Sequence, residues 1–153
     1  MKKPALNRLI AACGGSTVVE FALVGTIFLM FLFGCIEYAR LLWSEMALQQ
    51  TAMSGARCMA IAQGSVQSSS CSSSGSYSST TTNSYVETVA SAWGITLTSS
   101  GIALNNSATC GGLSGSSQVT LTSTFTTPVP QLVMLSSGGT SLTATACYPN
   151  NAY

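Results

Sequence analysis

The chain contains no histidine and no aspartate, and only 6% of its 153 residues are charged. The missing histidines exclude Ser-His-Asp and Cys-His catalysis as well as histidine-ligated metal sites. Three of the four acidic residues, Glu20, Glu37 and Glu45, lie in or beside an apolar segment, where paired catalytic carboxylates would have no water-filled cleft. We therefore expect no enzymatic activity and no cofactor.

The chain also lacks a large excess of positive or negative charge: the formal net charge is +1, and no basic stripe is present. Nucleic-acid binding requires clustered Lys and Arg side chains that release counterions from phosphates. Beyond residue 64 the only charged residue is Glu87, and Ser and Thr are abundant. Soluble cytosolic domains usually depend on charged side chains for solubility. The composition therefore favours an exported protein, and it indicates neither nucleic acid nor a small-molecule substrate as a partner.

The N-terminal region has a basic start and then a long apolar run. Three cations within residues 1–15 precede a Gly-Gly pair, and Glu20 is the only charged residue in the run over 18–36. A helix over this run would be ~28 Å long, close to the ~30 Å hydrocarbon core of a bilayer. The pattern predicts a leader over 1–15 and then a transmembrane helix. The positive-inside rule places the N-terminus in the cytoplasm and residues 41–153 outside.

The helix is predicted to continue well beyond the membrane. Residues 37–62 contain no proline and one glycine, Gly55, and they are rich in helix-forming residues. Glu37 and Arg40 form an i,i+3 pair of opposite charges. Small residues persist along this part, so that a neighbouring helix can approach closely. We expect one helix over 16–63 that packs against the same helix of other subunits.

The remainder of the chain predicts a small head domain. Residues 64–83 are a low-complexity Ser/Thr segment, which we interpret as a loop. A short helix fits Ser84–Trp93, and period-two alternation predicts about three antiparallel strands. The alternating segments are 95–104, 119–125 and 142–146. The expected fold class is α+β, in which a long N-terminal membrane-spanning helix carries a disulfide-stapled head over 84–153.

Four cysteines follow the membrane segment, namely Cys58, Cys71, Cys110 and Cys147. An even number of cysteines in a small Ser/Thr-rich domain indicates disulfides formed in an oxidising compartment. No Cys-x-x-Cys pair occurs, which argues against a zinc site. Four cysteines allow three connectivities, and sequence alone does not choose among them. We favour Cys58–Cys71, which would tie the helix end to the Ser-rich loop, together with Cys110–Cys147, which would join two strands.

Two stretches of the helix carry a specific resemblance. They are Gly15-Ser-Thr-Val-Val-Glu20-Phe-Ala-Leu-Val24 and Phe28-Leu-Met-Phe-Leu-Phe-Gly34-Cys-Ile-Glu37-Tyr-Ala-Arg40. Over residues 14–57 the chain resembles the TadE-like family, the pseudopilin-like minor subunits of the tight-adherence (Flp, type IVb) pilus machinery. The chain departs from the family at Thr26, where a proline is common.

The resemblance implies that a prepilin peptidase cleaves between Gly15 and Ser16. Glu20, followed by Phe21, would then be the fifth residue of the mature chain and would pair with the N-terminal amine of a neighbouring subunit. The implied partners are the peptidase, other pilin or pseudopilin subunits and the Tad assembly platform. The implied location is the bacterial inner membrane, with a single span and a periplasmic head, and the extracellular pilus is a further destination.

The physical chemistry of Glu20 independently supports this role. A carboxylate carried to the bilayer centre costs roughly 2.5–3.5 kcal/mol, so such a residue usually has a function. Pairing with a buried ammonium offsets part of both desolvation penalties. Helices in lipid lack a hydrophobic drive to associate, so one charge pair can set their axial register. The alternative is a glutamate that merely snorkels to the nearby interface.

Two other interpretations remain open at the level of sequence. Leu32-Phe33-Gly34-Cys35 resembles a lipobox, in which Cys35 would be acylated after removal of a signal peptide. Against this interpretation, Phe33 is bulky where small residues are usual, and the helical pattern continues through Glu37 and Arg40. The second alternative is a plain single-pass membrane-anchored binding module that is never cleaved.

Overall fold

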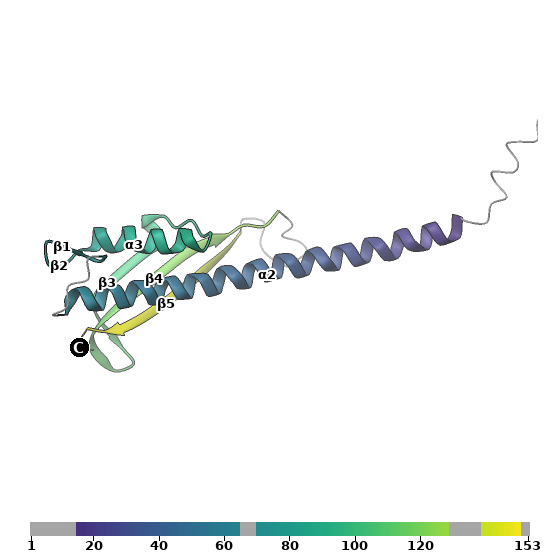
Figure 1. Ribbon diagram of the computed structural model, residues 1–153. Helices are drawn as coiled ribbons and strands as arrows, with labels where there is room; N and C mark the ends of the chain where they lie inside the picture. The colour runs from purple at the N-terminus through teal and green to yellow at the C-terminus, as the bar shows by residue number, and fades with distance from the viewer. Residues whose placement is uncertain (1–14, 65–69, 129–138, 151–153) are drawn as a thin grey trace, which may run out of the picture.

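The computed structural model describes residues 15–64, 70–128 and 139–150 (Figure 1). Its elements in chain order are α2 (Gly15–Gln63), β1 (Ser72–Ser73), β2 (Ser76–Tyr77), α3 (Ser79–Ala92), η1 (Ser99–Gly101), β3 (Ile102–Cys110), β4 (Leu113–Phe125) and β5 (Thr140–Pro149). The N-terminal half of α2 extends away from the other elements, which lie along its C-terminal half. This arrangement confirms the α+β class with a long N-terminal helix. The predicted leader, except for Gly15, lies outside the described residues.

Helix α2 is continuous because its sequence offers no break. It contains no proline, and its 49 residues at ~1.5 Å each give a length of roughly 70 Å. Thr26 does not interrupt it, since its hydroxyl donates to the carbonyl oxygen of Ala22 at 2.7 Å. A threonine hydroxyl satisfied inside the helix is compatible with apolar surroundings. The helix therefore runs unbroken from its apolar half into the head.

Strands β3, β4 and β5 form one antiparallel sheet in that order. The central strand β4 pairs with β5 without a register break, whereas its pairing with β3 shifts around Ala108. Alternation along β4 buries Val119 and Leu121 on the face that meets the helices. Pro128 lies just beyond β4, where its missing N–H costs no ladder bond.

The Ser/Thr segment contains more regular structure than the predicted loop. Within it, β1 and β2 form an antiparallel hairpin, whose turn places Ser74 and Gly75 at positive φ values of 54° and 81°. A second difference follows α3: residues 95–98, expected to begin a strand, have no regular structure and lead into η1. Regular pairing with β4 begins only at Ile102.

The sequence predicts that the second helix begins at Ser84. In the structure, helix α3 begins earlier, at Ser79. Ser78 caps it, because its Oγ accepts a hydrogen bond from the backbone N–H of Thr81 at 3.4 Å. The hydroxyl of the buried Thr82 donates to the carbonyl oxygen of Ser78 at 2.8 Å. Capping and burial thus extend the helix into residues of weak intrinsic helix propensity.

The core lies where α2, α3 and the sheet meet. It consists of Leu48, Ala52, Ala56 and Met59 from α2, Val86 and Ala90 from α3, Leu97, and Val119, Leu121 and Ala144 from the sheet. The two helices are very close at Gly55, where an added Cβ would lie 2.8 Å from Cγ2 of Val86. The head is therefore packed on the C-terminal half of α2.

Candidate functional site

The N-terminal half of α2 is an uncovered apolar rod. Its most apolar 18-residue window has a mean hydropathy of 2.3, and none of that window is buried. Large side chains such as Phe21 and Phe31 are 79% and 72% exposed. In the described part of the chain, α2 is the one helix long and apolar enough to cross a membrane. This half of α2 could therefore span a membrane, with the head at one end of the span.

The residues predicted to act in processing and assembly all lie in the first two turns of α2. Gly15 begins the helix, and Ser16 and Glu20 share one of its faces because they are four residues apart. Glu20 and Phe21 are both exposed. The structure therefore brings these residues together at one end of the rod and presents them to the surroundings of the helix, far from the head (Figure 1).

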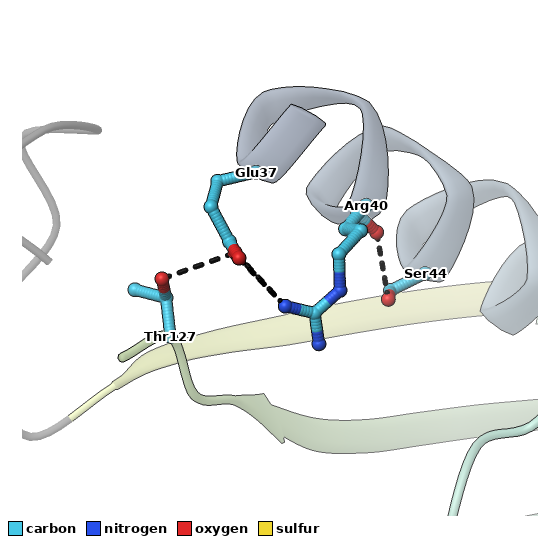
Figure 2. Close-up of polar contacts among 4 residues, drawn as sticks. All are labelled: Glu37, Arg40, Ser44 and Thr127. Carbon is cyan, nitrogen blue, oxygen red and sulfur yellow. Dashed lines mark hydrogen bonds and ion pairs between the residues drawn. The ribbon is translucent and has the colours of Figure 1, made fainter. Parts of the chain in front are cut away.

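A polar cluster occupies the point where the rod meets the head. Glu37, the first buried residue of α2, accepts hydrogen bonds from Arg40 Nη1 at 2.8 and 3.1 Å, one to each carboxylate oxygen. Thr127 Oγ1 donates to Oε2 of the same carboxylate at 3.1 Å (Figure 2). Ser44 Oγ donates to the carbonyl oxygen of Arg40 at 2.9 Å. The guanidinium also lies over the Phe125 ring, 5.8 Å from its centroid.

This Glu37 cluster ties the helix to the end of strand β4. The carboxylate is nearly enclosed, with its side chain 11% exposed, and the hydrogen bonds from Arg40 and Thr127 offset the cost of burying it. The sequence identified the Glu37–Arg40 pair, but it gave no sign of Thr127, which is 90 positions away. Neither a lone threonine nor Phe125 carries a signal that could have assigned it to this cluster.

A second contact between helix and head involves the only two tryptophans of the chain. Trp43 of α2 and Trp93, the residue that caps the C-terminus of α3, pack edge to face with ring centroids 5.8 Å apart. Both remain substantially exposed, at 59% and 42%. This pair was not predicted from the sequence, although the position of Trp43 a few residues past an apolar run is a signal that could have marked it.

Both disulfides lie in the head, and their pairing is the one favoured from the sequence. Cys58 and Cys71 are joined with Cα atoms 5.8 Å apart, which ties the end of α2 to the start of the β1–β2 hairpin. Cys110 and Cys147 are joined with Cα atoms 6.3 Å apart, across the ends of β3 and β5. Among the described residues, Cys35 is the free cysteine, and it is exposed on the apolar rod.

A ring of amides and hydroxyls closes the far end of the head. Gln63 Nε2 donates to Ser117 Oγ at 2.8 Å, and Ser117 Oγ donates to Asn150 Oδ1 at 2.6 Å. Asn150 Nδ2 donates back to Gln63 Oε1 at 3.2 Å and to the carbonyl oxygen of Asn106 at 2.9 Å. The last residue of α2 is thereby fixed to β3, β4 and the end of β5.

Comparison with known protein families agrees with the geometry of α2. Residues 15–57 match the family model of TadE-like proteins. This confirms the resemblance seen in the sequence, over the apolar rod and most of the helix that carries the head. The match ends before α3 and the sheet. No curated protein and no solved structure is significantly similar to the chain.

The described residues hold no group of three or more His, Cys, Asp or Glu side chains that could bind a metal ion. A surface hollow of ≈ 290 Å³ lies between Arg57, Cys58 and Tyr85. The Glu37 cluster and the ring around Asn150 are both polar contacts that join α2 to the head.

Proposed function

We propose that this chain is a minor pilin or pseudopilin that acts in the assembly of a tight-adherence (Flp, type IVb) pilus. The observation that carries the proposal is the match to TadE-like proteins over 15–57, which falls on a helix with an uncovered apolar half. Such a helix can hold the subunit in a membrane and later pack among its counterparts, while the head stays outside. This role is structural and requires no catalysis.

The first step of the proposal is removal of the leader by a prepilin peptidase between Gly15 and Ser16. Gly15 is the first residue of α2, and beyond its neighbours in the chain no described residue lies within 4 Å of the place where its Cβ would be, which leaves the bond after it open to a peptidase. Cleavage there would give the mature chain an N-terminal amine at Ser16. That amine would lie on the same helical face as Glu20, one turn away.

The second step is pairing between subunits. Once the leader is removed, residues 16–36 contain no Lys or Arg, so the Glu20 carboxylate needs a cation from another chain when lipid or other helices surround it. The N-terminal amine of a neighbouring subunit supplies that charge. Phe21, which follows Glu20 and is 79% exposed, contributes apolar contact at the same level.

Beyond the apolar run, α2 also offers a face for packing between subunits. Leu42, Met46 and Met53 are 42%, 65% and 59% exposed, and they lie on the outward side of the helix, away from the core stripe. Spacings of four and seven residues place them on one line along the helix. In the proposed assembly this line contacts the helices of other pilin subunits or of the Tad assembly platform.

The proposed location follows from the same layout. The subunit would be inserted in the bacterial inner membrane with its N-terminus in the cytoplasm and its head in the periplasm, where both disulfides can form. From there it would support assembly or enter the extracellular pilus.

The experiment that tests this proposal is the intact mass and N-terminal sequence of the protein purified from membranes. A chain that starts at Ser16 supports pilin-type processing. A lipid-modified start at Cys35 would instead make the protein a lipoprotein, and an uncleaved N-terminus would leave a plain anchor.

A glycine variant makes the test specific. Gly15→Val should leave the full-length precursor in the membrane, because the peptidase requires a small residue before the cleaved bond. The matched control is Gly25→Val, which alters another α2 glycine with nothing within 4 Å and should be processed normally. Normal maturation of Gly15→Val would contradict the proposed cleavage.

A further inference from the structure

A groove opens where the apolar rod of α2 meets the membrane-facing end of the head. Its volume is ≈ 450 Å³, and it lies between one face of α2 and the turn that follows α3. Its walls include Ile36, Ala39, Arg40 and Trp43 from α2, and Trp93 and Ile95 from the head. The groove thus combines an apolar floor, two amphipathic aromatic rings and one cation.

The position of this groove relative to the apolar run is the first argument for its role. Ile36, the last residue of the run, forms part of the groove wall, so the groove is continuous with the uncovered surface that faces lipid. The headgroup layer on each side of a ~30 Å hydrocarbon core is about 5–8 Å thick. Along the axis of α2, the Cα atom of Trp43 lies about 10 Å beyond the Cα atom of Ile36. A helical side chain points back toward the N-terminus, so the Trp43 ring lies lower, at headgroup level.

The chemistry of the lining is the second argument. Indole rings concentrate at membrane interfaces because their apolar bodies and N–H donors suit the boundary between acyl chains and headgroups. Nη1 of Arg40 is bound to Glu37, but the guanidinium is half-exposed and its other N–H groups suit phosphate oxygens. Trp93 is the most informative residue for the position of the head. It belongs to the head, and its contact with Trp43 brings it to the level of the lipid headgroups.

We propose that the groove between Trp43 and Trp93 binds phospholipid of the membrane leaflet on the side of the head. Glycerol and upper acyl carbons would lie on Ile36, Ala39 and Ile95, and the phosphate would be held near Arg40. The head then rests on the bilayer surface in one orientation, in addition to being tethered by its helix. This contact belongs to the membrane-inserted subunit and does not depend on assembly into a pilus.

The test uses the two tryptophans as reporters of depth. The full-length chain is reconstituted into phosphatidylethanolamine–phosphatidylglycerol vesicles that carry a nitroxide either on the headgroup or at mid-chain. Trp43→Phe leaves Trp93 as the only tryptophan, and Trp93→Phe leaves Trp43. Both variants keep an aromatic ring at the contact, so the fold should be preserved.

The matched control is a triple variant, Trp43→Phe, Trp93→Phe and Leu113→Trp. Leu113 is 66% exposed and begins β4, at the end of the head opposite to the membrane. Its single tryptophan should stay accessible to water-soluble acrylamide and escape the nitroxides.

The expected result is that headgroup nitroxides quench Trp93 several-fold more than they quench the Leu113→Trp reporter, and more than mid-chain nitroxides do. Equal quenching of Trp93 and of the control would overturn the proposal. A Trp93 emission that is shielded from both nitroxides and depends on the protein-to-lipid ratio would also overturn it, since a second copy of the chain would then fill the groove.

Discussion

At the scale of single residues, the environments of two glutamates on one helix are opposite. Glu37 is buried and receives donors from Arg40 and Thr127 of its own chain. Glu20 is exposed on the apolar rod, and in the described part of the chain it has no ion-pair partner. The first glutamate therefore joins α2 to the head within the subunit, whereas the second is available for the proposed pairing between subunits.

Glu20→Gln should keep membrane insertion and cleavage but impair assembly, because the neutral amide cannot pair with a buried ammonium. Loss of one partner of a buried ion pair costs about 3–5 kcal/mol, so incorporation into pili should fall by about a hundredfold or more. The measurement is the ratio of protein in sheared pili to protein in membranes. Val19→Ala, a change at the adjacent exposed position, is the control, and unchanged incorporation of Glu20→Gln would show that the acid is only tolerated.

Tyr77 gives a prediction about pH. Burial raises the pKa of the Tyr77 phenol above 10.0, although its hydrogen bond with Thr82 works in the opposite direction. In the unfolded chain this phenol ionises near pH 10, while the folded chain still holds the proton, so stability should fall as the pH rises beyond 10.

The check is the melting temperature of the detergent-solubilised chain between about pH 8 and about pH 12. Tyr77→Phe should reduce the fall in melting temperature at alkaline pH, because phenylalanine has no proton to release. Tyr38→Phe, at an exposed tyrosine on α2, is the control. Identical alkaline profiles for Tyr77→Phe and the unaltered chain would refute the prediction.

At the scale of elements, α2 has two different functions along its length. Its first half is apolar and not covered by other elements. Its second half contributes Leu48, Ala52, Ala56 and Met59 to the core of the head. Helix α3 packs directly against this second half, and the sheet completes the core. The close approach at Gly55 decides how near the two helices can lie.

Gly55→Leu should therefore destabilise the head. The side chain would enter space occupied by Val86 and would face Val119, whose methyl groups lie 3.6 Å from an added Cβ. Overpacking of this kind costs typically about 1–3 kcal/mol. Chemical unfolding followed by tryptophan fluorescence measures it, and Gly25→Leu, which meets open space, should leave the head unaffected. Equal stability of the two variants would show that the α2–α3 contact can relax.

At the scale of the whole molecule, the head is fastened to α2 at both of its ends. At the end next to the apolar half of α2, the Glu37 cluster and the Trp43–Trp93 contact hold it, and at the far end the ring around Asn150 and the Cys58–Cys71 bridge do. The sheet lies along the helix between these points (Figure 1). Helix and head should therefore move as one body in assembly.

The two disulfides should differ in how readily they open in the folded protein. Cys147 is exposed, whereas Cys71 is fully buried and Cys58 is 7% exposed. A thiolate must reach the sulfur that it attacks, so mild reductant should open Cys110–Cys147 first. Alkylation after brief reduction, followed by peptide mass analysis, measures the order. Prior modification of Cys58 or Cys71 would contradict the burial described here.

Much of the fold could be predicted because its signals are contiguous in sequence. The absence of proline and the apolar run defined α2, and alternation around Val119 and Leu121 defined the central strand. The early start of α3 was missed, because Ser and Thr have weak helix propensity and only the cap at Ser78 and the burial of Thr82 offset it. The β1–β2 hairpin was missed for a similar reason, since its strands consist mainly of serine.

The sequence by itself determined which half of α2 is apolar, where Glu20 lies and that four cysteines follow the apolar run. These are properties of neighbouring residues, set by hydrophobicity, helix periodicity and charge. Only the tertiary structure decided that Thr127 and Phe125 meet Glu37 and Arg40, and that Trp93 meets Trp43 at the end of the rod. Contacts between residues so distant in the chain exist only after the head has packed on the helix, because packing alone fixes which side chains face each other.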